Sequence, residues 1–149
     1  MFLYNLKDKP DYLKEFVLSC HDEWGTPWKA AEAKQKLNEK IELNLKRLEK
    51  ELTLILLEGE ELAGFVSLLE KDCEERPLLS PWYATLYVKE KYRGCNLTQI
   101  LTTAILKEAK LMGFDKVYLK TELTNFYEKY GFSFLEMLAN GEKIYYIDL

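Results

Sequence analysis

The sequence predicts an α+β (mixed α/β) domain with a central, mostly antiparallel sheet. Three features support this: two helical stretches near the N-terminus, a strand–helix–strand unit between Trp82 and Thr121, and a hairpin on each side of that unit. Hairpins pair antiparallel strands, whereas a crossover through a helix pairs parallel ones. We therefore expect one parallel contact within an otherwise antiparallel sheet.

The N-terminal third predicts a short strand and then two helices. The strand covers residues 2–6, and after Pro10 the apolar positions follow helical spacing until Gly25. These positions are Leu13, Phe16, Val17, Cys20 and Trp24. Thr26 is expected to be the N-cap of the second helix, with Pro27 at its first position. The apolar face of that helix contains Leu37, Ile41, Leu45 and Leu48.

The remainder reads as strands interrupted by a long helix. Residues 52–57 and 62–69 predict a hairpin around Gly59, and residues 82–88 the next strand. A helix from Leu97 to Gly113 and a strand over 116–121 follow. A short helix over 123–130, closed by Gly131, precedes a final hairpin of residues 132–138 and 143–149 around Asn140 and Gly141.

Composition limits the classes of function. The 149 residues fit a single domain, 1–149, and a net charge of -4 provides no broad positive surface for nucleic acid. No apolar run is long enough to cross a membrane, and the N-terminus lacks the pattern of a secretory signal. Three well-separated cysteines suit a reducing compartment, so we expect a cytoplasmic protein. No spacing of histidines or cysteines predicts a metal site.

The most informative stretch runs from Leu86 to Phe132. A strand ends at Tyr87 and Val88, and YRGCNLT (residues 92–98) leads into the long helix. Such a turn directs several unpaired backbone N–H groups toward one point, which suits an anion such as a pyrophosphate. Later in the stretch comes FYEKYGF, residues 126–132.

These residues resemble the GNAT family of acyl-CoA-dependent N-acyltransferases, over nearly the whole chain. Arg93 and Gly94 match the opening of the family's R/Q-x-x-G-x-G/A motif, and FYEKYGF is similar to its FYEKxGF segment. Asn96 and Thr98 stand where glycine, or glycine and alanine, are usual. Asn enters the left-handed region at low cost, and the Thr hydroxyl is a donor for a phosphate oxygen.

The resemblance implies a fold, a cofactor and a set of binding residues. The fold is a twisted sheet with a splayed pair of parallel strands, flanked by helices on both faces. The cofactor is acetyl-CoA. The residues implied in its binding are Leu86, Tyr87, Val88, Arg93, Gly94, Cys95, Asn96, Leu97, Thr98 and Gln99.

Direct transfer of an acetyl group to a primary amine needs a neutral amine and a proton for the departing thiolate. Tyr127 resembles the family's general acid, and a phenol with a pKa of about 10 stays protonated at neutral pH. For the acceptor, the sequence indicates carboxylates and an aromatic face that suit an ammonium group, namely Asp22, Glu23, Trp24 and Glu122.

Other interpretations stay open at this level. Asn96 and Thr98 favour a non-catalytic CoA-binding or protein-interaction module on the same scaffold, and an α+β domain without CoA is a third possibility. The amine acceptor, which is a small molecule or a peptide, is not identified by the sequence, because loops build acceptor pockets. The general base and the oligomeric state, a homodimer included, are equally open.

Overall fold

The computed structural model describes all residues, 1–149, and contains one seven-stranded sheet. Its strands are β1 (Phe2–Asn5), β2 (Leu52–Glu58), β3 (Glu61–Leu69), β4 (Trp82–Val88), β5 (Lys116–Thr121), β6 (Ser133–Met137) and β7 (Lys143–Asp148). They lie in the order β1-β2-β3-β4-β5-β7-β6. Every neighbouring pair is antiparallel except β4 and β5. The predicted mixed sheet is confirmed.

The parallel pair is splayed. β4 and β5 are in register only at Trp82 and Tyr118, near the beginning of β4. Beyond that point the strands diverge, so the C-terminal half of β4 has β3 as a neighbour on one side and no strand on the other. An opened sheet of this kind leaves backbone donors and acceptors of β4 free along one edge.

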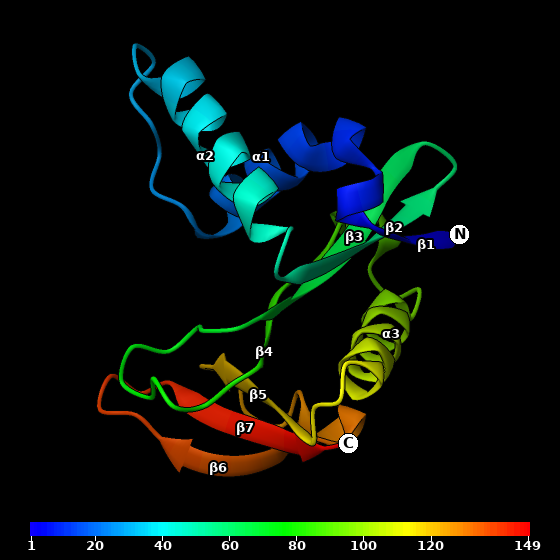
Figure 1. The fold of residues 1–149 in the computed structure, drawn as a ribbon, viewed down its shortest axis with the longest axis vertical. Helices are drawn as coiled ribbons and strands as arrows, with labels where there is room; N and C mark the ends of the chain where they lie inside the picture. The colour runs from blue at the N-terminus through cyan, green and yellow to red at the C-terminus, as the bar shows by residue number, and fades with distance from the viewer.

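Helices cover both faces of the sheet, as expected. Helices α1 (Leu13–Trp24) and α2 (Ala33–Arg47) lie together on one side, and α3 (Leu97–Leu111) lies on the other (Figure 1). Short 3₁₀ turns occur at Leu6–Asp8, Pro10–Tyr12, Glu90–Tyr92 and Glu128–Tyr130. No helix is both long and apolar enough to span a membrane.

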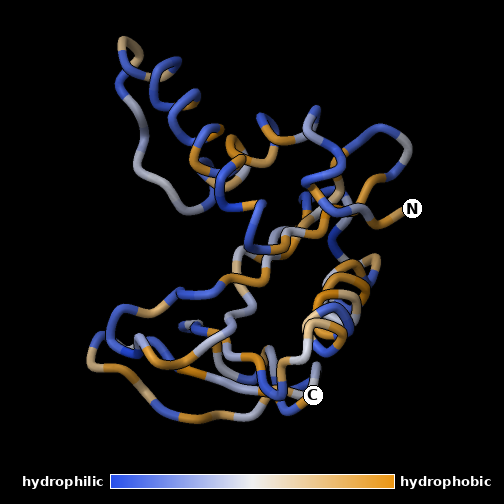
Figure 2. Tube along the Cα trace, viewed as in Figure 1, coloured by the Kyte–Doolittle hydropathy of each residue, from blue (hydrophilic) through white to orange (hydrophobic).

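Alternation along β2 and β3 builds the two halves of the core. Ile55 and Phe65 face α1, whereas Leu54 and Val66 face α3, because successive strand residues point to opposite faces. The α3 side is the larger cluster and includes Leu101 and Ile105, which are fully buried. Helix α2 is mostly hydrophilic and has no buried residue (Figure 2), and its main contact is with α1.

The second helix begins later than predicted. It starts at Ala33, and the chain from Thr26 to Glu32 is not helical. The Trp28 ring stacks on the His21 imidazole at a centroid distance of 3.7 Å, which holds Pro27 and Trp28 against the end of α1. A tertiary contact therefore overrides the local Thr-Pro helix-start pattern.

The predicted helix over residues 123–130 is also wrong. Only a 3₁₀ turn at Glu128–Tyr130 forms there, closed by Gly131 at φ 97°. Asn125 has φ 59°, which is incompatible with a helix, and the Thr121 hydroxyl accepts the Leu123 N–H instead. An eight-residue helix has little stability of its own, so these local contacts decide the conformation.

Candidate active site

The YRGCNLT segment forms a loop that leaves the N-terminus of α3 open. Gly94 and Asn96 both adopt left-handed backbone conformations, with φ of 82° and 62°. Asn96 is the N-cap of α3, but its side chain caps no N–H group. The first N–H groups of a helix have no acceptor within the helix, so those of Leu97, Thr98 and Gln99 are available to an anion. Asn96 thus takes the conformation for which glycine is usual.

A groove of about 440 Å³ lies where this loop meets the splayed edge of β4. We call it the β4 groove. Its lining includes Leu86, Tyr87, Val88, Arg93, Gly94, Asn96, Leu97 and Thr98. The sequence-predicted Cys95 belongs to this loop and Gln99 to the first turn of α3, and both are exposed and outside the lining. Free backbone on β4 and open N–H groups on α3 together suit an extended ligand with a phosphorylated end.

The groove also contains residues that the sequence interpretation did not single out. These are Tyr92, Phe126, Lys129 and Tyr130. The Lys129 ammonium lies 4.5 Å from the centre of the Phe126 ring and so remains near the groove, where it adds positive charge. Phe126, Lys129 and Tyr130 belong to the FYEKYGF segment and Tyr92 begins YRGCNLT, so both motifs contained a signal for these residues.

Tyr127 lies beside the groove lining rather than in it. Its ring makes edge contacts with Tyr83, Phe126 and Phe132 at centroid distances of 5.9, 4.8 and 6.1 Å. Burial raises the pKa of Tyr127 to about 12, with a smaller contribution from Tyr130. The phenol is therefore protonated throughout the neutral range and is able to donate a hydrogen bond.

A second cavity, of about 350 Å³, lies between helices α1 and α2 and the sheet. We call it the α1–α2 pocket. Phe16, Trp24, Trp28, Arg47 and Thr85 are among its lining residues. Thr85 has φ 52°, where β4 bulges against β3 between Ala84 and Tyr87. The next residue, Leu86, lines the β4 groove, so the two cavities adjoin at this bulge.

The predicted acceptor residues separate in the structure. Trp24 lines the α1–α2 pocket, and Glu23 lines the β4 groove. Asp22 and Glu122 are exposed and line neither cavity, and the Glu122 carbonyl accepts a hydrogen bond from Lys143 Nζ at 3.4 Å. Asp22 and Trp24 are two residues apart on α1, so their side chains point in different directions.

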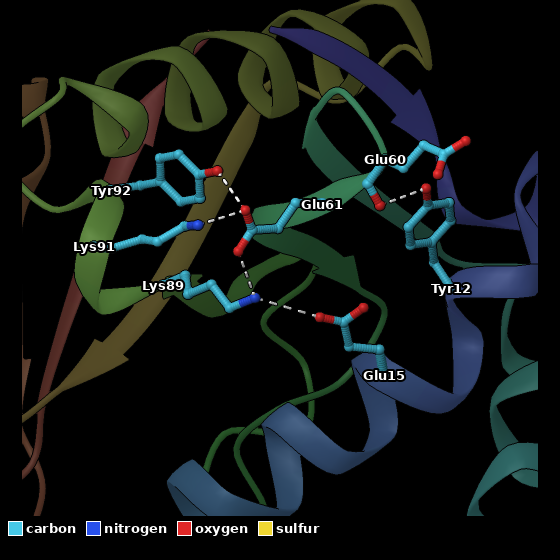
Figure 3. Close-up of polar contacts among 7 residues, drawn as sticks. All are labelled: Tyr12, Glu15, Glu60, Glu61, Lys89, Lys91 and Tyr92. Carbon is cyan, nitrogen blue, oxygen red and sulfur yellow. Dashed lines mark hydrogen bonds and ion pairs between the residues drawn. The ribbon is translucent and has the colours of Figure 1, made fainter.

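A cluster of charged and polar side chains anchors the start of the loop (Figure 3). Glu61, the first residue of β3, accepts hydrogen bonds from Tyr92 Oη at 2.7 Å and Lys89 Nζ at 3.1 Å, and pairs with Lys91 Nζ at 2.6 Å. Lys89 also approaches Glu15 of α1 at 3.6 Å. The Glu61 carboxylate therefore ties the segment that enters the loop to the β2–β3 hairpin, and Lys89 links the same segment to α1 through Glu15.

The Glu61 cluster should weaken in acid. Hydrogen bonds from Lys91, Tyr92 and Lys89 lower the pKa of Glu61 from 4.5 to about 2. A lowered folded-state pKa gives stability that is present above about pH 4.5 and is lost as the pH falls toward 2. We expect the melting temperature of Glu61→Gln to lie below that of the wild type at neutral pH and to converge with it below pH 3. A constant difference across this range would contradict the assignment.

The left-handed backbone at Asn96 predicts a residue-specific result. Asn96→Gly should bind acetyl-CoA as the wild type does, because glycine adopts φ 62° freely. Asn96→Val should lose about 1–2 kcal/mol of stability, because a β-branched side chain is strained there, and should bind the cofactor more weakly. Urea unfolding and calorimetric titration measure the two effects. Equal behaviour of both variants would show that the loop does not depend on this conformation.

The splayed sheet, the β4 groove and the open α3 N-terminus form a site whose shape and free N–H groups suit a long phosphorylated ligand. The model of the acetyltransferase (GNAT) family matches residues 12–132. The chain therefore belongs to the GNAT family of acetyl-CoA-dependent N-acetyltransferases. Acetyl-CoA is its cofactor, and Gly94, Asn96 and the N-terminus of α3 fit a pyrophosphate, because no side chain fills the space above Gly94.

Solved structures with the same fold cover nearly the whole chain. An N-acetyltransferase from Staphylococcus aureus Mu50 is 16% identical, with a TM-score of 0.76 over 99% of this chain and 97% of that one. Aminoglycoside 6'-acetyltransferase type Ii is 17% identical, with a TM-score of 0.74 and the same coverage. The paia N-acetyltransferase of Thermoplasma acidophilum, in complex with coenzyme A, is 19% identical, with a TM-score of 0.67 over both full chains. No curated protein sequence matches significantly.

Proposed function

We propose that the chain acetylates a primary amine that binds in the α1–α2 pocket, with acetyl-CoA in the β4 groove. The observation that carries this proposal is the bulge of β4, where Thr85 lines one cavity and Leu86 the other. An amine at this junction would lie next to the end of a ligand that follows β4. Holding two reactants in one geometry is a large part of catalysis of a bimolecular reaction.

Acetyl-CoA supplies an activated acyl group as a thioester. We assign its binding to the backbone of Leu86, Tyr87 and Val88 and to the loop from Arg93 to Gln99. Arg93 Nε donates to the Val88 carbonyl at 3.2 Å, which holds the loop against the end of β4. A free backbone N–H of β4 is the donor best placed for the negative charge that develops on the acetyl oxygen.

We assign Tyr127 as the donor to the leaving sulfur. In the overall exchange the amine nitrogen bonds to the acetyl carbon, the carbon–sulfur bond breaks, and the proton that the amine loses ends on sulfur. A phenol with a pKa of about 12 holds its proton more tightly than a thiol with a pKa of about 8.5. Tyr127 therefore stabilises the departing sulfur by hydrogen bonding. It transfers its own proton to the sulfur only if the proton that the amine loses replaces it at once.

The test of this proposal measures binding and turnover separately. Calorimetric titration with acetyl-CoA is expected to give saturable heat, and a panel of primary amines is expected to release free thiol in an amine-dependent manner. Saturable binding with no thiol release from any amine would favour the non-catalytic module instead. Absence of binding heat would refute the assignment of the β4 groove.

A further inference from the structure

The α1–α2 pocket contains a guanidinium group without a counter-ion. Arg47, at the end of α2, donates from Nε to Asn44 Oδ1 and from Nη2 to Thr53 Oγ1, each at 3.0 Å. Arg47 takes part in none of the ion pairs of the structure. A guanidinium has five N–H donors, so most of its hydrogen-bonding capacity is unused.

Two buried side-chain polar atoms in the chain lack a hydrogen-bond partner, and both belong to residues of this pocket. They are Nη1 of Arg47 and Oγ1 of Thr85. Buried polar groups in native proteins are nearly always paired, so each exception needs an explanation. A ligand that brings an acceptor to Arg47 and a donor to Thr85 would satisfy both atoms.

The protein itself supplies no negative charge to the pocket. None of its lining residues is an aspartate or glutamate, and Lys40 is a second cation in the lining. Burial raises the pKa of the Cys20 thiol to about 12, so that it stays neutral beside Arg47. The Glu51 carboxylate, which acts on Arg47 from outside the pocket lining, accepts the N–H of Glu70. The pocket is thus positive at the end where Arg47 lies.

The guanidinium is held in a fixed position. Thr53, which accepts from Arg47, also shares a hydrogen bond of 2.7 Å with the Ser67 hydroxyl, and both side chains are buried. The Arg47 Cζ atom lies 5.9 Å from the centre of the Phe16 ring. A fixed planar guanidinium matches the two oxygens of a carboxylate, and little conformational entropy is lost when it binds one.

We propose that the acceptor is a small primary amine that also carries a carboxylate, which Arg47 binds while Thr85 faces the amine. This inference rests on the proposed function, since Thr85 adjoins the β4 groove. Phe16, Trp24 and Trp28 provide aromatic surface between these polar points, which suits an apolar side chain such as that of an amino acid. A polycation is disfavoured because it would place like charges beside Arg47 and Lys40.

The experiment compares amino acids with their own carboxamides. Leucine, phenylalanine and tryptophan, each against its amide, are assayed by thiol release in the presence of acetyl-CoA. The amine of the amide is less basic, so a larger fraction of it is neutral at neutral pH, which favours the amide over the acid when nothing recognises the carboxylate. We nevertheless expect kcat/KM to be about 10- to 100-fold higher for at least one free acid, as one charge-assisted contact provides. Arg47→Met should reduce this ratio to one or below.

Lys46→Met is the matched control. It removes the same charge from the neighbouring residue of α2, which is exposed and outside the pocket lining, and it should retain the preference. Both variants should bind acetyl-CoA as the wild type does. Efficient acetylation of the amides or of spermidine, with no preference for any free acid, would overturn the proposal.

A binding measurement separates this inference from the proposed function. Without acetyl-CoA, the free amino acids should raise the melting temperature of the wild type and of Lys46→Met, but not of Arg47→Met. If this dependence on Arg47 appears without turnover, carboxylate recognition stands and the proposed transfer reaction fails. Carboxylate recognition is refuted, whatever the activity, in either of two cases. In the first, none of the acids raises the melting temperature of the wild type; in the second, the acids raise the melting temperature of Arg47→Met as much as that of the wild type.

Discussion

Tyr127→Phe is expected to slow turnover about 100-fold, the lower end of what a positioned proton donor contributes. The substitution removes only the hydroxyl, so the edge contacts of the ring with Tyr83 and Phe126 remain. Acetyl-CoA affinity should be nearly unchanged, because Tyr127 lies outside the lining of the β4 groove. Steady-state rates of thiol release and calorimetric titration check the two parts.

The raised pKa of Tyr127 predicts the pH dependence of turnover, and the comparison of Tyr127→Phe with a control variant distinguishes a donor from a packing residue. Because the pKa of Tyr127 is about 12, the phenol stays protonated between pH 6 and 10, and its deprotonation should cause no fall in rate there. Tyr146→Phe is the control, since Tyr146 lies on β7 outside both cavities. Equal turnover of Tyr127→Phe and the wild type would remove the donor role and leave Tyr127 as a packing residue.

Leu101→Ala should cost about 2–5 kcal/mol of unfolding free energy, as other leucine truncations in cores do. Leu101 is 0% exposed and lies on α3 against β3. A Cβ atom built on Gly64 would be 3.3 Å from Leu101 Cδ1, which shows how closely the helix approaches the strand. The loss is large because a typical domain has only about 5–15 kcal/mol of stability.

Leu111→Ala provides the matched comparison for Leu101→Ala. It makes the same substitution on the same helix, but Leu111 is 71% exposed, so the cost should stay within about 0.5 kcal/mol. Urea unfolding of the two variants measures the difference. Similar losses would mean that helix propensity, rather than packing of α3 on β3, determines its stability.

Local patterns in the sequence predicted most of the elements and part of the site. Strands β4 and β5 and the start of α3 lie where the sequence placed them, because alternation, helical periodicity and Gly113 are strong local signals. Asn96 adopts the left-handed conformation that its residue type favours, with a φ of 62°. These features depend on residues that are neighbours in the chain.

Two elements were misplaced because specific side-chain contacts and backbone angles, which the apolar periodicity does not encode, decided them. Trp28 stacks on His21 and delays the start of α2, while the positive φ of Asn125 breaks the helix expected around Tyr127. The α1–α2 pocket was missed for a similar reason. Arg47 appears in the sequence as an ordinary charge near a helix end, and nothing in its neighbourhood shows that it reaches Thr53.

The sequence by itself determined the mixed sheet, the loop at Arg93–Thr98 and the family, since each depends on periodicity or on a contiguous motif. Only the tertiary structure decided where the α1–α2 pocket lies and which charges it contains. Burial and hydrogen-bond pairing join residues of α1, α2, β3 and β4, and the chain order does not encode which polar atoms remain without a partner.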